Sequence, residues 1–122
     1  MSAPFSFDEA VFKLLGDELG DDYAVEVLQA FLADTADKMA KLAINGHDRE
    51  LVKREAHSVK GSAATFGFDD LARLARELER GAQTIPVEQL ETSVRELRQV
   101  FEATEQFAKT NLLLQAGPGA AA

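Results

Sequence analysis

The feature that most constrains the fold is a repeated spacing of three and four between apolar residues. Five residues between positions 48 and 66 keep this spacing: Val52, Ala56, Val59, Ala63 and Phe66. The segments 21–44 and 86–108 carry similar stripes, and alternating strand-like patterns are nearly absent. Such spacing places apolar side chains on one face of a helix. The sequence therefore predicts an all-α fold of amphipathic helices.

Turn signals divide the chain into five helices. The breaks are expected at residues 16–20, at Asn45–Gly46, near Gly67 and at Gly81, while Pro86 suits the first turn of the last helix. Short connections make neighbouring helices antiparallel. We therefore expect an antiparallel up-and-down four-helix bundle with a short additional N-terminal helix packed across it.

The first helix has a capping-box pattern at its start. Ser6 is the expected cap and Glu9 its reciprocal partner. The short helix that follows carries the apolar residues Val11, Leu14 and Leu15.

Length and composition predict one domain that buries a single core. We expect this domain over residues 1–114, followed by a flexible C-terminal tail of residues 115–122 that is rich in Gly and Ala. The 122 residues include 21 acidic and 13 basic side chains and no cysteine, giving a net charge of −8. This balance disfavours nucleic acid as a partner, and no apolar run is long enough to span a membrane. The N-terminus does not have the pattern of a signal peptide. We expect a soluble, cytoplasmic domain that acts as a monomer.

Gly61 lies inside the third helix, where a glycine is unfavourable. It costs about 1 kcal/mol relative to alanine, yet the buried stripe continues past it from Val52 to Phe66. The helix therefore does not end at Gly61. The missing side chain is better explained by a need for space on the helix surface.

His57 is the chemically notable residue beside this space. At about 100° per residue it lies about 140° from Val52, on the solvent face. Its neighbours on that face are Lys53, Arg54, Lys60, Gly61 and Ala64. None of these is a metal-ligand type, so we expect no metal site here. Cations beside the ring suit a bound anion instead.

An exposed imidazole with a free approach is suited to accept a phosphoryl group. Imidazole has an ordinary pKa of about 6.5, so its neutral, nucleophilic form is available near neutral pH. Lys60 could offset the charge of the phosphoryl group. The stretch from Arg49 to Lys60 is locally basic, with four basic and two acidic side chains, and could attract an acidic partner. A solvated surface without a role is the alternative explanation for these charges.

These residues resemble the motif of the histidine-containing phosphotransfer (HPt) domain family. The matching positions are His57, Lys60, Gly61, Ser62, Ala63 and Gly67. The resemblance extends over about residues 8–110. The stretch "AHSVKGSAATFGF" also looks like the N-terminal phosphotransfer domain of chemotaxis kinases, although no kinase or ATP-binding segment follows it.

The resemblance implies a phosphocarrier of a two-component phosphorelay, without kinase activity of its own. His57 would accept a phosphoryl group from a receiver-domain aspartate or a sensor or hybrid histidine kinase, and pass it to a response-regulator receiver domain. Lys60 would be the charge partner, and Gly61 would allow close docking. No cofactor is implied for this chain, since Mg²⁺ is expected only in the receiver domain.

The remaining positions of the expected site have secondary roles. Ala64, Lys53 and Arg54 flank the approach to His57 and would contact the docked partner. Ser62 lies toward the flank, where capping or packing of its own helix is an equally good explanation. Gly67 is structural, at the turn that ends the helix.

Three other functions remain open from the sequence. The same bundle could dock a kinase or receiver without carrying phosphate, or serve only as a structural or dimerising unit, which would leave Gly61 unexplained. An enzyme would need a second catalytic group, and neither Cys nor a G-x-S-x-G motif is present. His47 is expected in a solvated turn, and a joint site with His57 would require the loop to fold back over two helical turns.

Overall fold

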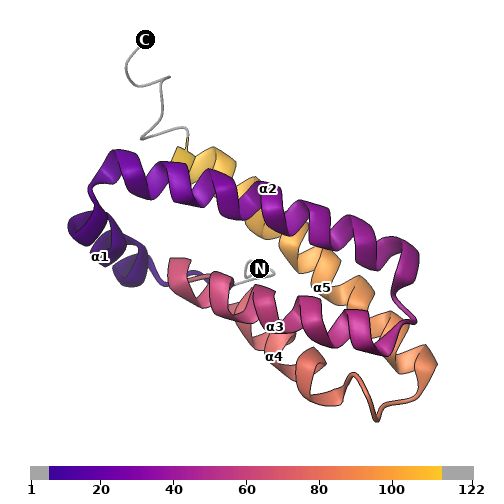
Figure 1. Ribbon diagram of the computed structural model, residues 1–122. Helices are drawn as coiled ribbons and strands as arrows, with labels where there is room; N and C mark the ends of the chain where they lie inside the picture. Colours follow the sequence, from indigo (N-terminus) through magenta and orange to yellow (C-terminus); the bar gives the residue numbers. More distant parts are fainter. Residues whose placement is uncertain (1–5, 114–122) are drawn as a thin grey trace, which may run out of the picture.

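The computed structural model describes residues 6–113 and consists of helices (Figure 1). The elements are α1 (Glu9–Leu19), α2 (Asp21–Asn45), α3 (Arg49–Phe66), α4 (Asp69–Gly81), α5 (Val87–Phe107) and the π-helical turn η1 (Ala108–Leu113). The only strand-like pairing in these residues is one isolated bridge between Phe7 and Phe68. The predicted all-α fold is confirmed. The expected C-terminal tail, residues 115–122, lies outside the described residues.

Helices α2 to α5 enclose a common core, and α1 packs at one end of it. Contacts connect α2 with α3, α3 with α4, α4 with α5, and α5 back to α2. The α3–α4 contact is the most extensive, and the two helices lie side by side in Figure 1. Helix α1 contacts α2 and α3. The close pairing of α3 with α4 matters most for the site, because α3 carries His57.

The predicted apolar stripes form the core. The residues expected inward on α2, α3 and α5 are all buried: Leu28, Phe31, Leu32, Thr35, Met39, Leu42, Val52, Ala56, Val59, Ala63, Phe66, Leu90, Val94, Leu97, Phe101, Thr104 and Ala108. On α4 the stripe holds for Leu71, Ala75 and Leu78, with Leu74 half-buried. Full burial of each large aliphatic side chain contributes about 1.5–3 kcal/mol. This burial holds α3 in place with its opposite face exposed.

The start of α1 differs from the predicted capping box. Asp8, not Ser6, is the N-cap, and its carboxylate accepts from the backbone N–H groups of Ala10 and Val11. The Ser6 carbonyl instead accepts from the Asp69 N–H, beside the Phe7–Phe68 bridge. Leu14, one of the apolar residues of this helix, is 57% exposed. The N-terminal segment thus bonds to the α3–α4 turn before α1 begins. The N-cap of α1 is therefore Asp8, two residues after the predicted Ser6.

Gly67 forms that turn and requires the conformation of glycine. Its φ of 85° is left-handed, and its N–H bonds to carbonyls of the last turn of α3. A Cβ at this position would lie 2.5 Å from the Asp8 carbonyl oxygen. Both the backbone angle and the close contact exclude a side chain. Gly67 thus lies at the turn that ends α3, where the sequence placed it.

Substituting Gly67 should therefore destabilise the fold, whereas substituting Gly61 should not. We expect Gly67→Ala to lower the free energy of unfolding by about 1–3 kcal/mol, because of left-handed strain and the Asp8 contact. Gly61→Ala, in open space on a helix, should raise it by up to about 1 kcal/mol. Urea unfolding of both variants measures the difference. Equal stabilities would contradict this account of the turn.

Candidate functional site

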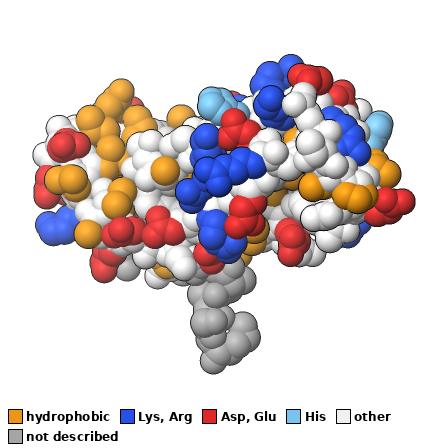
Figure 2. Space-filling model, turned by 90° about the horizontal axis from the view of Figure 1, so that it is seen from below, with side chains coloured by type: hydrophobic (Ala, Val, Ile, Leu, Met, Phe, Trp, Pro, Cys, Tyr) orange, Lys and Arg blue, Asp and Glu red, His pale blue; other side chains and the backbone are white. Residues whose placement is uncertain are grey.

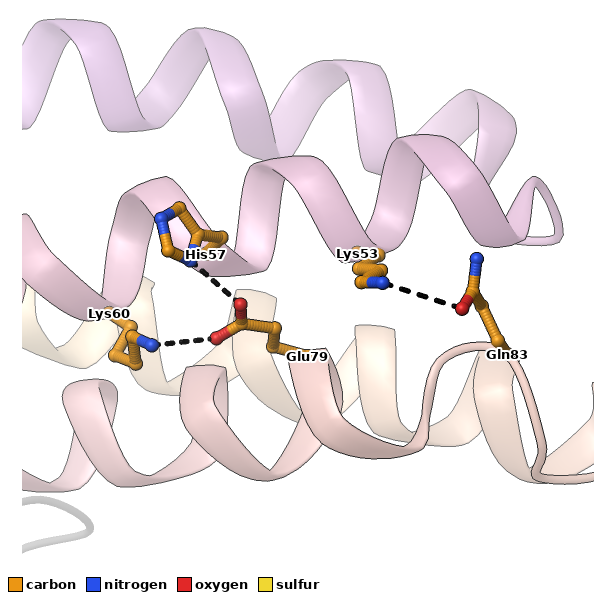
Figure 3. A network of polar contacts seen from close by, with 5 residues as sticks. All are labelled: Lys53, His57, Lys60, Glu79 and Gln83. Carbon is orange, nitrogen blue, oxygen red and sulfur yellow. Dashed lines mark hydrogen bonds and ion pairs between the residues drawn. The ribbon is translucent and has the colours of Figure 1, made fainter.

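His57 lies on the solvent face of α3, as predicted. Its side chain is 68% exposed, while Ala56 and Val59 on either side are buried in the core. Figure 3 shows the imidazole extending from α3 with one ring nitrogen toward α4 and the other away from it. The helix therefore presents the ring at the surface without enclosing it.

A carboxylate from α4, Glu79, binds both His57 and Lys60 (Figure 3). The Glu79 Oε2 atom lies 2.7 Å from His57 Nδ1, and Oε1 lies 2.8 Å from Lys60 Nζ. The Glu79 side chain is only 19% exposed. One carboxylate therefore fixes the ring and the lysine relative to each other.

Sequence reasoning did not find Glu79, although one signal points to it. His57 lies ten residues before Gly67 and Glu79 twelve residues after it. Two antiparallel helices that meet at Gly67 place these residues about 15 Å and 18 Å from the turn, and thus near each other. Counting outward from the glycine turn would have brought a carboxylate to the histidine.

The electrostatics of Glu79 determine how the ring is held. The hydrogen bond from Lys60, and then that from His57, hold the pKa of Glu79 below its ordinary value. The group is therefore an ionised carboxylate at neutral pH and can only accept hydrogen bonds. The proton of a neutral His57 ring consequently resides on Nδ1. Its Nε2 atom then carries the lone pair.

The approach to the ring from the C-terminal side is open. No atom lies within 4 Å of the position that a Gly61 Cβ would occupy, apart from the adjoining helix backbone. Ala64, one turn further along, is exposed and small. Ser62 is half-buried and lines a separate hollow between α2 and α3, next to Phe31 and Phe66. Gly61 and Ala64 thus flank His57 as expected, whereas Ser62 faces another helix.

On the N-terminal side, a hollow adjoins the ring. Its lining residues are Glu50, Lys53, Arg54, His57 and Glu79. Lys53 Nζ lies 3.4 Å from Oε1 of Gln83, in the segment that follows α4. Basic and acidic side chains are interspersed on the face shown in Figure 2. The surface around the site is therefore a mixture of charges, with cations beside the histidine.

Two basic residues near the start of α3 lie apart from the ring. The Arg49 guanidinium donates to the Ala82 carbonyl, which links α3 to the end of α4. His47 is exposed at the α2–α3 turn and lines another hollow with Arg95 and Arg98. Within residues 6–113, no group of three or more His, Cys, Asp or Glu side chains is placed to hold a metal ion.

The site therefore presents an exposed imidazole, a side chain of the kind that can act as a nucleophile. The His57 imidazole stands on the outer face of the helices, held through Nδ1 and open at Nε2. No helix among the described residues is long and apolar enough to cross a membrane.

Comparison with known proteins identifies the family. The Hpt domain family matches residues 26–107, which include α3 and α4, and the chain belongs to this family. It is 27% identical over 101 residues to the phosphorelay protein LuxU of Vibrio cholerae, covering 81% of this chain and 89% of that protein. The crystal structure of histidine-containing phosphotransfer protein B (HptB) from Pseudomonas aeruginosa PAO1 is similar at a TM-score of 0.60 and 28% identity. That match covers 86% of this chain and 97% of HptB. The chain is a histidine phosphotransfer protein.

The pKa of Glu79 should depend more on Lys60 than on His57. We expect Lys60→Met to raise the pKa of Glu79 toward its ordinary value of 4.5. His57→Gln should raise this pKa less, because the hydrogen bond from Lys60 lowers it more than the hydrogen bond from His57 does. Lys53→Met, which changes a nearby cation bonded to Gln83, should have a smaller effect. Carbon-detected NMR titration of the Glu79 carboxyl measures all three. If Lys53→Met shifted the pKa of Glu79 as much as Lys60→Met does, the cause would be the general positive charge of the surface and not the contact between Lys60 and Glu79.

The same contacts predict when Glu79 stabilises the fold. The pKa of Glu79 is lower in the folded state than in the unfolded state. Its contribution to the free energy of unfolding is therefore fully present above the unfolded-state pKa. The contribution is lost as the pH falls through the folded-state pKa, which lies below 4.5. For a partly exposed ion pair this contribution is about 0–1 kcal/mol.

Proposed function

We propose that His57 is the phosphoacceptor of this phosphotransfer protein. Nε2 would accept a phosphoryl group from a receiver-domain aspartate or from a histidine kinase, and a receiver-domain aspartate would then take it. The observation that carries the proposal is the fixed ring: Glu79 holds Nδ1 at 2.7 Å, and 68% of the side chain is exposed. Membership of the Hpt family and similarity to the phosphorelay protein LuxU support it.

The transfer is a displacement at phosphorus between two side chains. The lone pair of His57 Nε2 forms an N–P bond, the P–O bond to the donor aspartate breaks, and its electron pair remains on the departing carboxylate. The imidazole ring gains positive charge in this step. Glu79, which accepts the Nδ1–H, stabilises that charge as a carboxylate beside a catalytic histidine does. In the reverse direction the same bonds form and break.

Lys60 and Gly61 would serve the transfer in different ways. Lys60 lies in contact with the carboxylate that holds the ring, and its charge would offset that of the incoming phosphoryl oxygens. Gly61 leaves open space one turn from His57, so that the backbone of a partner could approach. Ala64, Lys53 and Arg54 border this approach and would contact the docked partner, while Ser62 would support α3 from the α2 side.

The proposed partners are response-regulator receiver domains and a sensor or hybrid histidine kinase. The carrier would act in the cytoplasm as a monomeric antiparallel four-helix bundle with α1 as its additional N-terminal helix, and without binding nucleic acid or membrane. It would have no kinase activity, because the chemistry above needs a donor that is already phosphorylated. The Mg²⁺ ion would belong to the receiver domain, and no cofactor is proposed for this chain.

Phosphotransfer to wild type and His57→Gln tests the proposal. Incubation with a panel of phosphorylated receiver domains or hybrid kinases should give wild type an acid-labile, alkali-stable label that His57→Gln lacks. His47→Gln is the matched control and should be labelled like wild type. Binding of both proteins without label in either would instead support a docking module that carries no phosphate.

Gly61→Leu should separate docking from folding. We expect helix content to be unchanged or higher by circular dichroism, since leucine favours helix over glycine. Transfer from a receiver domain should be blocked, because the side chain fills the space next to His57. Gly61→Ala, with one methyl group, should retain more transfer. Normal transfer in Gly61→Leu would refute the steric role of the glycine.

A further inference from the structure

A phosphoryl group on His57 would meet a Lys60 charge that is already shared with Glu79. Such a group carries a charge of about −1.5 to −2 at neutral pH. The Lys60 ammonium is 2.8 Å from the Glu79 carboxylate, so the charges of this pair largely cancel. A second cation near Nε2 would therefore add to the charge that Lys60 offers the phosphoryl group.

The hollow on the N-terminal side of His57 contains one cation without a partner. Of its five lining residues, His57 is bonded to Glu79, Lys53 to Gln83, and Glu50 also to Gln83. The fifth, Arg54, forms no hydrogen bond or ion pair with any residue in the range 6–113. Its guanidinium is thus available to a ligand that enters the hollow.

The position of Arg54 suits a ligand attached to the ring. It precedes His57 by three residues, and residues at this spacing are neighbours on a helix surface. Gly61, four residues after His57, leaves the opposite side clear. An approaching partner can use the cleared side, while the arginine remains beside the ring. The guanidinium fork also matches phosphoryl oxygens in geometry better than an ammonium does.

We propose that Arg54 binds the phosphoryl group carried on His57 Nε2 and adds its charge to that of Lys60, part of which Glu79 balances. This inference rests on the proposed function of His57. Arg54 is then a phosphate-binding residue of the phosphorylated state, in addition to any contact it makes with a docked receiver domain. Lys53, although it lines the same hollow, is bonded to Gln83 and has a smaller part.

The pKa of the phosphoryl group itself tests this assignment. The protein is phosphorylated with potassium phosphoramidate, without any partner protein, and the phosphohistidine signal is titrated by phosphorus NMR. A neighbouring cation lowers the pKa of an acidic group. Arg54→Gln should therefore raise the phosphoryl pKa by about 0.3–1. Arg54→Lys should restore part of the difference, and Lys53→Gln should leave the pKa near that of wild type.

The outcomes separate this inference from the proposed function. A phosphohistidine signal with the same pKa in wild type and Arg54→Gln would overturn the role of Arg54 and leave His57 as acceptor. If Lys60→Met changed the phosphoryl pKa and Arg54→Gln did not, Lys60 would be the cation that compensates the phosphoryl charge. This result would also overturn the role of Arg54. No phosphohistidine in wild type, with a folded protein by circular dichroism, would overturn both proposals.

Discussion

The left-handed turn at Gly67 determines where the two helices of the site meet. It ends α3, begins the reversal into α4, and is held against the Asp8 backbone by a 2.7 Å hydrogen bond from the Asp8 N–H to the Gly67 carbonyl. With the turn fixed, the packing of α3 on α4 sets the register that brings Glu79 to His57. A shift of one residue in α4 would turn Glu79 by about 100° and remove it from the ring. The chemistry of the histidine therefore depends on a backbone turn that lies ten residues away.

Helix α3 keeps stability and chemistry on opposite faces. Its inner face, from Val52 to Phe66, is buried in the core, whereas His57, Gly61 and Ala64 are exposed. The stabilising contacts therefore do not require any of these exposed side chains. A glycine in the exposed face lowers helix stability by about 1 kcal/mol, which the buried face offsets many times over. The fold can therefore tolerate a glycine on the surface near the histidine.

The sequence predicted the helices and the exposed histidine well, because both depend on local periodicity. A stripe such as Leu90 to Ala108 specifies its own buried face, and that face fixes which residues are exposed. The start of α1 was mispredicted because Ser6 and Asp8 are both good caps. The choice depends on the bond between the N-terminal segment and the α3–α4 turn. Glu79 was missed for the same reason, since its contact with His57 is set by packing between helices.

The shared carboxylate of Glu79 couples the histidine to the lysine. Each oxygen binds a different partner, so the Nδ1–H of His57 and the ammonium of Lys60 do not compete for one acceptor. In the proposed transfer, a lone lysine beside the imidazole would repel the positive charge that develops on the ring. With the carboxylate between them, the lysine is held close while the ring still has an anion at Nδ1. Under the proposed function, Glu79 would thereby make an adjacent cation compatible with a nucleophilic histidine.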